Sequence, residues 1–155
     1  MDLPVPGRGA IDLRHLVLDM NGTMAVDGVL LEGVAERLSR LGAVLHPVIL
    51  TADTHGGLAA VRDKLGIDAV ILSSGDEAGQ KLQVVRRLGP AQCVSVGNGA
   101  NDALMLKESA VGICVVGREG AAVEALLNAD IAVTSIPDAL DLLLNPRRLI
   151  ATLRR

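Results

Sequence analysis

Phe, Tyr and Trp are all absent from this 155-residue sequence. A chain without aromatic rings lacks the stacking platforms with which many proteins bind single-stranded nucleic acid. It also lacks the rings that form a cage around quaternary ammonium ligands. The formal net charge is -3, so the basic footprint of a nucleic-acid-binding protein is missing as well. These absences predict that nucleic acid is not a partner.

We also expect no membrane helix, no leader sequence and no cysteine motif for metal or redox chemistry. No uninterrupted apolar stretch approaches the roughly 18 residues that a membrane helix needs, and residues 1–9 lack the apolar region of a signal peptide. Cys93 and Cys114 each lie in a β-branched run, without CxxC spacing or a Cys/His cluster. We therefore expect reduced core thiols in a cytoplasmic protein with no membrane partner.

The sequence is rich in aliphatic residues. Half of the residues are hydrophobic, which predicts a core made of Leu, Val, Ile, Ala and Met. A length of 155 residues fits one domain. We predict a single domain over 1–155, in which 1–14 form an N-terminal turn and strand and 15–155 form the main body. An N-terminal β-hairpin is one arrangement that residues 1–14 allow.

Short apolar runs alternate with helical patterns along 15–155. The runs are typical of strands buried on both faces of a parallel sheet, and they lie at 15–19, 47–51, 69–72, 93–97, 112–116 and 131–134. The helical patterns cover 31–41, 58–65, 80–88, 101–109, 119–128, 137–144 and 147–155. This alternation predicts an α/β fold with a doubly wound, mostly parallel sheet.

Polar residues gather where four of these elements are joined. Ligands in such folds bind at the carboxyl ends of the strands, so these residues are the functional candidates. They are Asp19-Met20-Asn21-Gly22-Thr23, Thr51-Ala52, Lys81, and Gly97-Asn98-Gly99-Ala100-Asn101-Asp102. Hydroxyls, turn N–H groups and a lysine can hold phosphate, and carboxylates can hold Mg²⁺. The pattern therefore predicts a phosphate site with Mg²⁺ as its cofactor.

These four segments, in this order, resemble the four motifs of the haloacid dehalogenase (HAD) superfamily of phosphotransferases. The first motif there is Asp-x-Asp-Gly-Thr and the last is Gly-Asp-Gly-x-Asn-Asp, which 19–23 and 97–102 match with two exceptions. Within the superfamily, the chain most resembles the phosphorylation domain of P-type ATPases, because Thr51-Ala52-Asp53 is similar to the Thr-Gly-Asp of that domain. The resemblance spans about 16–135 and implies an HAD-like Rossmannoid fold.

The resemblance implies a catalytic role for each matching residue. Asp19 would be the nucleophile that forms an aspartyl-phosphate. Thr51 and Lys81 would hold the phosphoryl group, and the turn N–H groups of Gly22 and Ala52 would bind its oxygens.

A metal site follows from the same resemblance. The Asp19 side chain and the Asn21 backbone carbonyl would bind Mg²⁺. Asn98 occupies a further ligand position, and Asp102 would either hold the metal or position Lys81.

Two family carboxylates are amides in this chain. Asn21 replaces the usual general acid/base, and loss of such a group typically slows a reaction roughly 10²–10⁴-fold. Asn98 replaces a metal ligand, so Mg²⁺ should bind more weakly. The sequence leaves open whether Asp53 or Asp76 compensates, and whether His55 overhangs the site.

Little room remains for a cap domain between the motifs. The segments that separate Thr23, Thr51 and Lys81 are already occupied by the expected helices and strands. The resemblance therefore implies a capless member. Such members often act on large substrates or form oligomers whose neighbours complete the site, so we expect a homo-oligomer.

Two functions remain in view. The first is a Mg²⁺-dependent phosphatase or phosphotransferase with an unidentified phosphorylated substrate, slowed by Asn21. The second is a non-catalytic phosphate-binding or regulatory protein of the same fold. A response-regulator receiver fits less well, because its acceptor Asp ends the third strand, whereas Asp19 ends the first.

Overall fold

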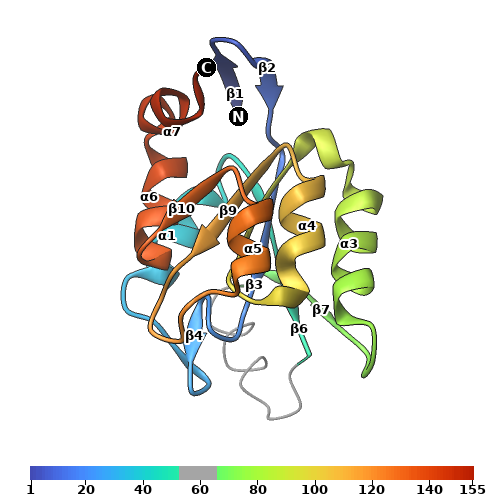
Figure 1. Ribbon diagram of the computed structural model, residues 1–155. Helices are drawn as coiled ribbons and strands as arrows, with labels where there is room; N and C mark the ends of the chain where they lie inside the picture. The colour runs from blue at the N-terminus through green and yellow to red at the C-terminus, as the bar shows by residue number, and fades with distance from the viewer. Residues whose placement is uncertain (53–65) are drawn as a thin grey trace.

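A parallel sheet forms the centre of the molecule in the computed structural model, which describes residues 1–52 and 66–155. Its strands are joined in the order β10-β9-β8-β3-β6-β7, and every neighbouring pair is parallel. They are β3 (His15–Asp19), β6 (His46–Thr51), β7 (Asp68–Ile71), β8 (Cys93–Gly97), β9 (Val111–Val115) and β10 (Ile131–Val133). The predicted α/β class and parallel sheet are confirmed (Figure 1).

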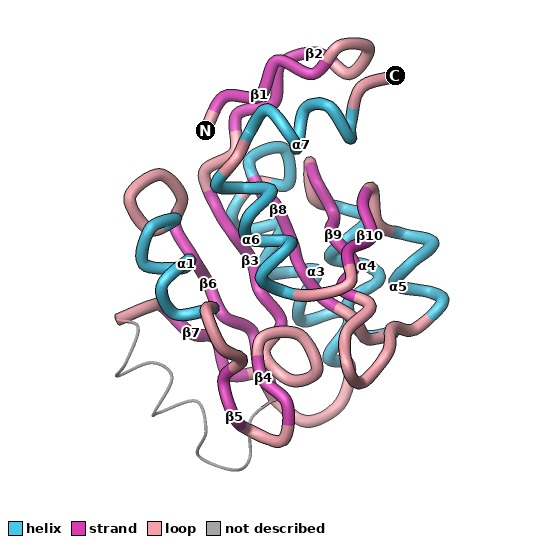
Figure 2. Tube along the Cα trace, turned by 90° about the vertical axis from the view of Figure 1, so that its left-hand side faces the viewer, coloured by secondary structure: helices cyan, strands magenta, loops and turns pink. Residues whose placement is uncertain are grey.

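Helices cover both faces of this sheet, as a doubly wound fold requires (Figure 2). One face carries α3 (Glu77–Leu88), α4 (Ala103–Glu108) and α5 (Val123–Asn128), with short 3-10 turns at η1 (Pro90–Gln92) and η2 (Ala100–Asp102). The other face carries α1 (Val34–Leu41) and α6 (Ile136–Leu144), and α7 (Pro146–Leu153) follows α6. The helix expected at 58–65 lies outside the described residues.

The core divides along the sheet as strand alternation dictates. On β3, Leu16 and Leu18 face the layer of α1 and α6, while Val17 joins Val85 and Met105 beneath α3 and α4. Cys93 and Cys114 are free and buried. Since aliphatic side chains fill both layers, aromatic rings are not needed to build the core.

Two antiparallel hairpins lie outside the main sheet. At the N-terminus, β1 (Asp2–Val5) pairs with β2 (Gly9–Asp12), so the predicted hairpin is confirmed. A second hairpin, β4 (Ala25–Val26) with β5 (Val29–Leu30), was not predicted. Its strands are only two residues long, too short for a hydrophobic pattern, although Asp27-Gly28 is a typical hairpin turn.

Three of the described helices begin three or more residues away from the predicted start. Helix α3 begins at Glu77, because the Asp76 carboxylate accepts a hydrogen bond from the Gly79 N–H (3.0 Å) and caps the helix. Helix α1 begins three residues later than expected, at Val34. Helix α5 begins at Val123 rather than 119, because residues 117–120 form a turn instead. None of the helices in the described part of the chain is long and apolar enough to cross a membrane.

Candidate active site

Strand register brings the sequence motifs to one edge of the sheet. Asp19 at the end of β3 pairs with Leu50 of β6, so Thr51 lies one residue further along that edge. On the other side Leu18 pairs with Val96, which places Gly97 of β8 beside Asp19. Strand β6 lies on one side of β3 and β8 lies on the other, so the strand order reverses at β3. Asp19 therefore lies at the switch point where such folds bind ligands.

A lysine from α3 links two of these motifs. Lys81 Nζ donates to Asp19 Oδ1 at 2.7 Å and to Asp102 Oδ1 at 2.6 Å. Its side chain is only 2% exposed, and that of Asp102 is fully buried. One ammonium therefore lies between two buried carboxylates, which carry more negative charge than it neutralises.

This imbalance shifts the proton affinities of the cluster. Burial and the Asp102 charge raise the pKa of Asp19 to about 7, although Lys81 and Thr23 act in the opposite direction. Burial alone would lower the pKa of Lys81, but Asp19 and Asp102 more than offset this, so its pKa lies above the usual value. The lysine therefore stays charged, and Asp19 retains its proton more readily than an exposed aspartate.

Both oxygens of Asp102 are engaged within the protein. Oδ1 accepts from Lys81, and Oδ2 accepts from the backbone N–H groups of Asn98 (2.9 Å) and Gly99 (2.8 Å). Asp102 thus holds both the lysine and the turn after β8. These contacts favour the positioning role over metal ligation for this residue.

Oxygen atoms from two motifs converge on Thr23. Its Oγ1 lies 3.0 Å from Asp19 Oδ2 and 3.0 Å from Asn98 Oδ1. A hydroxyl has one proton, so it satisfies only one of these acceptors at a time. Asn98 Nδ2 donates to Gly120 O (3.2 Å), and the amide oxygen faces the Thr23 hydroxyl.

This donor set fits a hard divalent cation, which prefers carboxylate, amide and carbonyl oxygens. Asp19 supplies a carboxylate, Asn98 supplies an amide oxygen, and Asn21 has an exposed side chain two residues after Asp19. No group of three or more His, Cys, Asp or Glu residues gathers in metal-binding geometry within 1–52 and 66–155. A metal held here would therefore depend on amide and backbone oxygens as well as on carboxylates.

The remaining predicted site residues divide into two groups. Thr51 is buried at the end of β6, with Ala52 next to it and Gly22 buried beside Asn98. Asp76 instead caps α3 and is exposed, so it does not replace a missing carboxylate. Asp53 and His55 lie outside the described residues.

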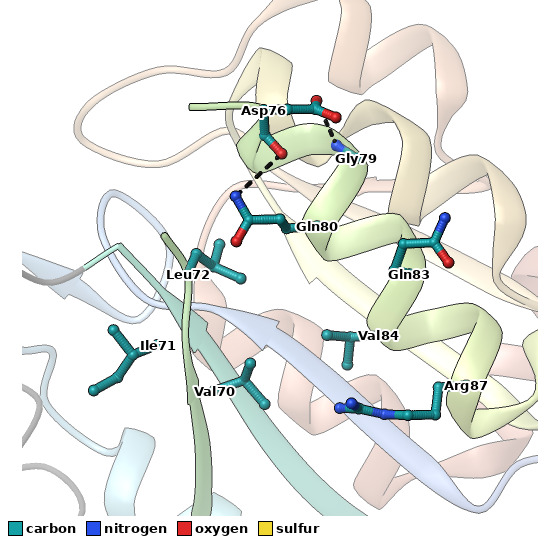
Figure 3. Close-up of a pocket in the computed structure, with 9 residues that line it drawn as sticks. All are labelled: Val70, Ile71, Leu72, Asp76, Gly79, Gln80, Gln83, Val84 and Arg87. Atoms are coloured by element: carbon teal, nitrogen blue, oxygen red, sulfur yellow. Dashed lines mark hydrogen bonds between the residues drawn. The ribbon is translucent and has the colours of Figure 1, made fainter. Parts of the chain in front are cut away.

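Asp76 borders a groove of about 560 Å³ between β7 and α3. Figure 3 shows the side chains of Gln80 and Arg87 on the face of α3 that lines this groove. Lys81 belongs to a different face of the same helix and contacts Asp19. The groove therefore contains none of the three residues Asp19, Lys81 and Asp102.

A smaller crevice of about 270 Å³ adjoins the Asp19 cluster. Its lining includes Gly22 and Thr23, the hydroxyl residues Thr134 and Ser135, and the cation of Arg118. This crevice therefore adjoins the first predicted motif.

Sequence reasoning missed Glu119, which lies beside Gly22. A Cβ atom built on Gly22 would lie 2.8 Å from Glu119 Oε2 and 2.8 Å from Asn98 Nδ2. Glu119 was assigned to a helix over 119–128, where no functional role was expected. The two glycines of Gly117-Arg118-Glu119-Gly120 were the available sign of a turn.

Comparison with known proteins places this geometry in context. No protein-family profile matches the chain. An uncharacterised protein of Methanocaldococcus jannaschii is 46% identical over 84 residues, which cover 52% of this chain and 90% of that protein.

Two solved structures are similar over nearly the whole chain. One is 3-deoxy-D-manno-octulosonate 8-phosphate phosphatase from Moraxella catarrhalis, in complex with magnesium ion, phosphate ion and KDO. Its TM-score is 0.70 at 17% identity, over 92% of this chain and 94% of that one. The other is a putative HAD family hydrolase from Streptomyces avermitilis, with a TM-score of 0.66 at 21% identity, over 98% of this chain and 88% of that one.

The chain therefore has the fold of the HAD superfamily phosphatases, as the four motifs predicted. Within this fold, it belongs to the same family as the Methanocaldococcus jannaschii protein. The nearer likeness to P-type ATPases remains an interpretation of the motifs.

Proposed function

We propose that this protein is a Mg²⁺-dependent phosphatase or phosphotransferase that acts through an aspartyl-phosphate on Asp19. The observation that carries the proposal is the buried contact of Lys81 with both Asp19 and Asp102 at the switch point of an HAD fold. Burial removes water from the Lys81 ammonium, so burying this charge costs solvation free energy. The same charge can stabilise a phosphoryl group at Asp19.

In this proposal an Asp19 oxygen attacks phosphorus while the bond from phosphorus to the leaving-group oxygen breaks. Thr51 and Lys81 hold the phosphoryl oxygens, and the Ala52 N–H binds them. The Gly22 N–H, expected to do the same, already donates to Ala25 O at 2.8 Å. Bound Mg²⁺, held by Asp19, the Asn21 carbonyl and Asn98, would neutralise the phosphate charge. Water then hydrolyses the aspartyl-phosphate and regenerates the Asp19 carboxylate.

Asn21 makes both proton transfers slow in this scheme. Its amide can neither protonate the leaving oxygen nor activate the water. Substrates whose leaving groups depart without a proton should therefore react best. Arg118, Thr134 and Ser135 in the adjoining crevice suit a polar, anionic leaving group. The complete site would include a second subunit, in keeping with the expected homo-oligomer.

Trapping with beryllium fluoride and Mg²⁺ tests the proposal. The complex mimics a phosphorylated aspartate, so it should raise the melting temperature of the wild type and leave Asp19→Asn unchanged. Asp76→Asn is the matched control, because Asp76 is a carboxylate outside the cluster. If the wild type forms no complex, the protein is not a working phosphotransferase.

Turnover of an aryl phosphate separates this function from phosphate binding alone. Asn21→Asp should increase the rate roughly 10²-fold or more, because it supplies the missing acid/base. If a folded Asn21→Asp variant that binds beryllium fluoride stays inactive, the non-catalytic phosphate-binding alternative is favoured.

A further inference from the structure

The Asp19 cluster lacks a carboxylate at the Asn98 position, and the structure supplies one from another part of the chain. Residues 117–120 form a turn between β9 and α5, closed by a hydrogen bond from the Gly120 N–H to Gly117 O (3.0 Å). Glu119 lies in this turn, and its side chain reaches back over Gly22.

Two hydrogen bonds join Asn98 to the segment that carries Glu119. Asn98 Nδ2 donates to Gly120 O at 3.2 Å, and the Ala122 N–H donates to Asn98 O at 2.8 Å. Both contacts follow Glu119 in the chain, and they hold its turn against Asn98. The closeness of this turn to Asn98 is therefore built into the fold, and the Glu119 side chain extends from it to Gly22.

Gly22 leaves the space in which these groups meet. The Oε2 atom of Glu119 and both polar side-chain atoms of Asn98 lie within 3.0 Å of the point that a Cβ on Gly22 would occupy. A side chain there would fill the space between the amide and the carboxylate. Asn98 Oδ1 also contacts the Thr23 hydroxyl, which contacts Asp19 Oδ2, so Thr23 links this space, the cradle, to the predicted metal position.

We infer that Glu119 replaces the missing carboxylate at Asn98 and strengthens divalent-cation binding at the Asp19 site. This inference rests on the proposed function, because it assigns a further residue to its metal. Hard cations bind more tightly as the carboxylate charge around them increases, and here Asn98 and Asn21 contribute none. Glu119 restores one negative charge next to the amide, from a turn that no HAD motif includes.

Mg²⁺ titration by calorimetry tests this inference without any measurement of activity, and Mn²⁺ binding followed by electron paramagnetic resonance counts the ions. Glu119→Gln should weaken the affinity roughly 10- to 100-fold, the range found when groups that support a metal site are removed. Glu124→Gln on α5 is the matched control and should bind as the wild type does, since Glu124 is also exposed but lies outside the cradle. Both variants should keep the melting temperature of the wild type.

Asn98→Asp provides the complementary test. It should tighten Mg²⁺ binding, and in the double variant Asn98→Asp/Glu119→Gln it should restore most of the affinity lost in Glu119→Gln. If Glu119→Gln binds Mg²⁺ as tightly as Glu124→Gln does, the inference is wrong, although the proposed function stands. If the wild type and Asn98→Asp both fail to bind Mg²⁺ and Mn²⁺, the metal dependence of the proposed function fails together with it.

Discussion

The two ends of the central sheet carry ion pairs that differ in burial. At the amino end, His46 of β6 meets Asp68 of β7 at 3.0 Å, with side chains 54% and 73% exposed. At the carboxyl end, Lys81 meets Asp19 at 2.7 Å, with side chains 2% and 9% exposed. Exposed pairs contribute little because water already solvates them, whereas buried charges depend on their partners. The difference indicates that the carboxyl end is organised for chemistry rather than for stability.

The largest contrast should come from removing one cation at each end. Lys81→Met leaves Asp19 and Asp102 buried without their ammonium, so the free energy of unfolding should fall by about 3–5 kcal/mol. Arg14→Met removes a cation from the exposed Arg14–Asp12 pair at the amino end and should leave stability almost unchanged. Urea unfolding at pH 7 without divalent metal measures both. Equal losses in the two variants would remove the contrast.

The pH dependence of stability sharpens the same comparison. Burial and Asp102 raise the pKa of Asp19 from 3.8 to about 7, so the folded state binds its proton more tightly than the unfolded state does. Stability should therefore fall as the pH rises from about 4 to about 7, by at most about 1.4 kcal/mol per pH unit. Urea unfolding in EDTA should show this slope in the wild type. In Asp19→Asn the slope should be much smaller, and an unchanged slope would place the titrating group elsewhere.

Alanine substitutions at two glycines with positive φ allow backbone strain at the site to be compared with backbone strain away from it. Gly9 has φ +87° and open space around it, so Gly9→Ala should cost about 1–2 kcal/mol from backbone strain alone. Gly22 has φ +78° and its missing Cβ would contact Asn98 and Glu119, so Gly22→Ala should lose more. Thermal unfolding ranks the two variants, and Mg²⁺ titration should show a loss for Gly22→Ala only. The reverse ranking would mean that the cradle is not tightly packed.

The smallest effect is expected for the exposed pair at the amino end. His46→Gln removes the contact with Asp68 in water, so it should change stability by less than about 1 kcal/mol. Beryllium fluoride binding should not change at all. A large loss of stability would show that the amino end contributes more than its exposure suggests.

Much of the fold could be predicted because its signals are local. The apolar runs at 15–19 and 93–97 match β3 and β8 at both ends. Helix starts were less accurate. The Asp76 cap makes α3 begin three residues before the predicted start, and a turn replaces the first residues of the helix expected at 119–128. The β4–β5 hairpin was not predicted, because strands of two residues are too short to show a hydrophobic periodicity.

The candidate site, like the fold, could be predicted only in part. Asp19, Thr51, Lys81 and Asp102 could be named from motifs at recognisable spacings. Asp19 and Thr51 end strands, Asp102 precedes a helix, and Lys81 lies within one. Glu119 could not be named, because its link to Asn98 joins two loops that no local pattern relates.

The sequence by itself determined the aliphatic core, the alternation of strands and helices, and the chemical types available where strands end. Each of these depends on neighbours in the chain, which local periodicity records. Only the tertiary structure decided which charged and polar groups contact one another. Lys81 lies between Asp19 and Asp102, both oxygens of Asp102 are used within the protein, and Glu119 comes to lie beside Asn98. Electrostatic interactions act through space, so partners far apart in the chain emerge only when the sheet aligns its strand ends.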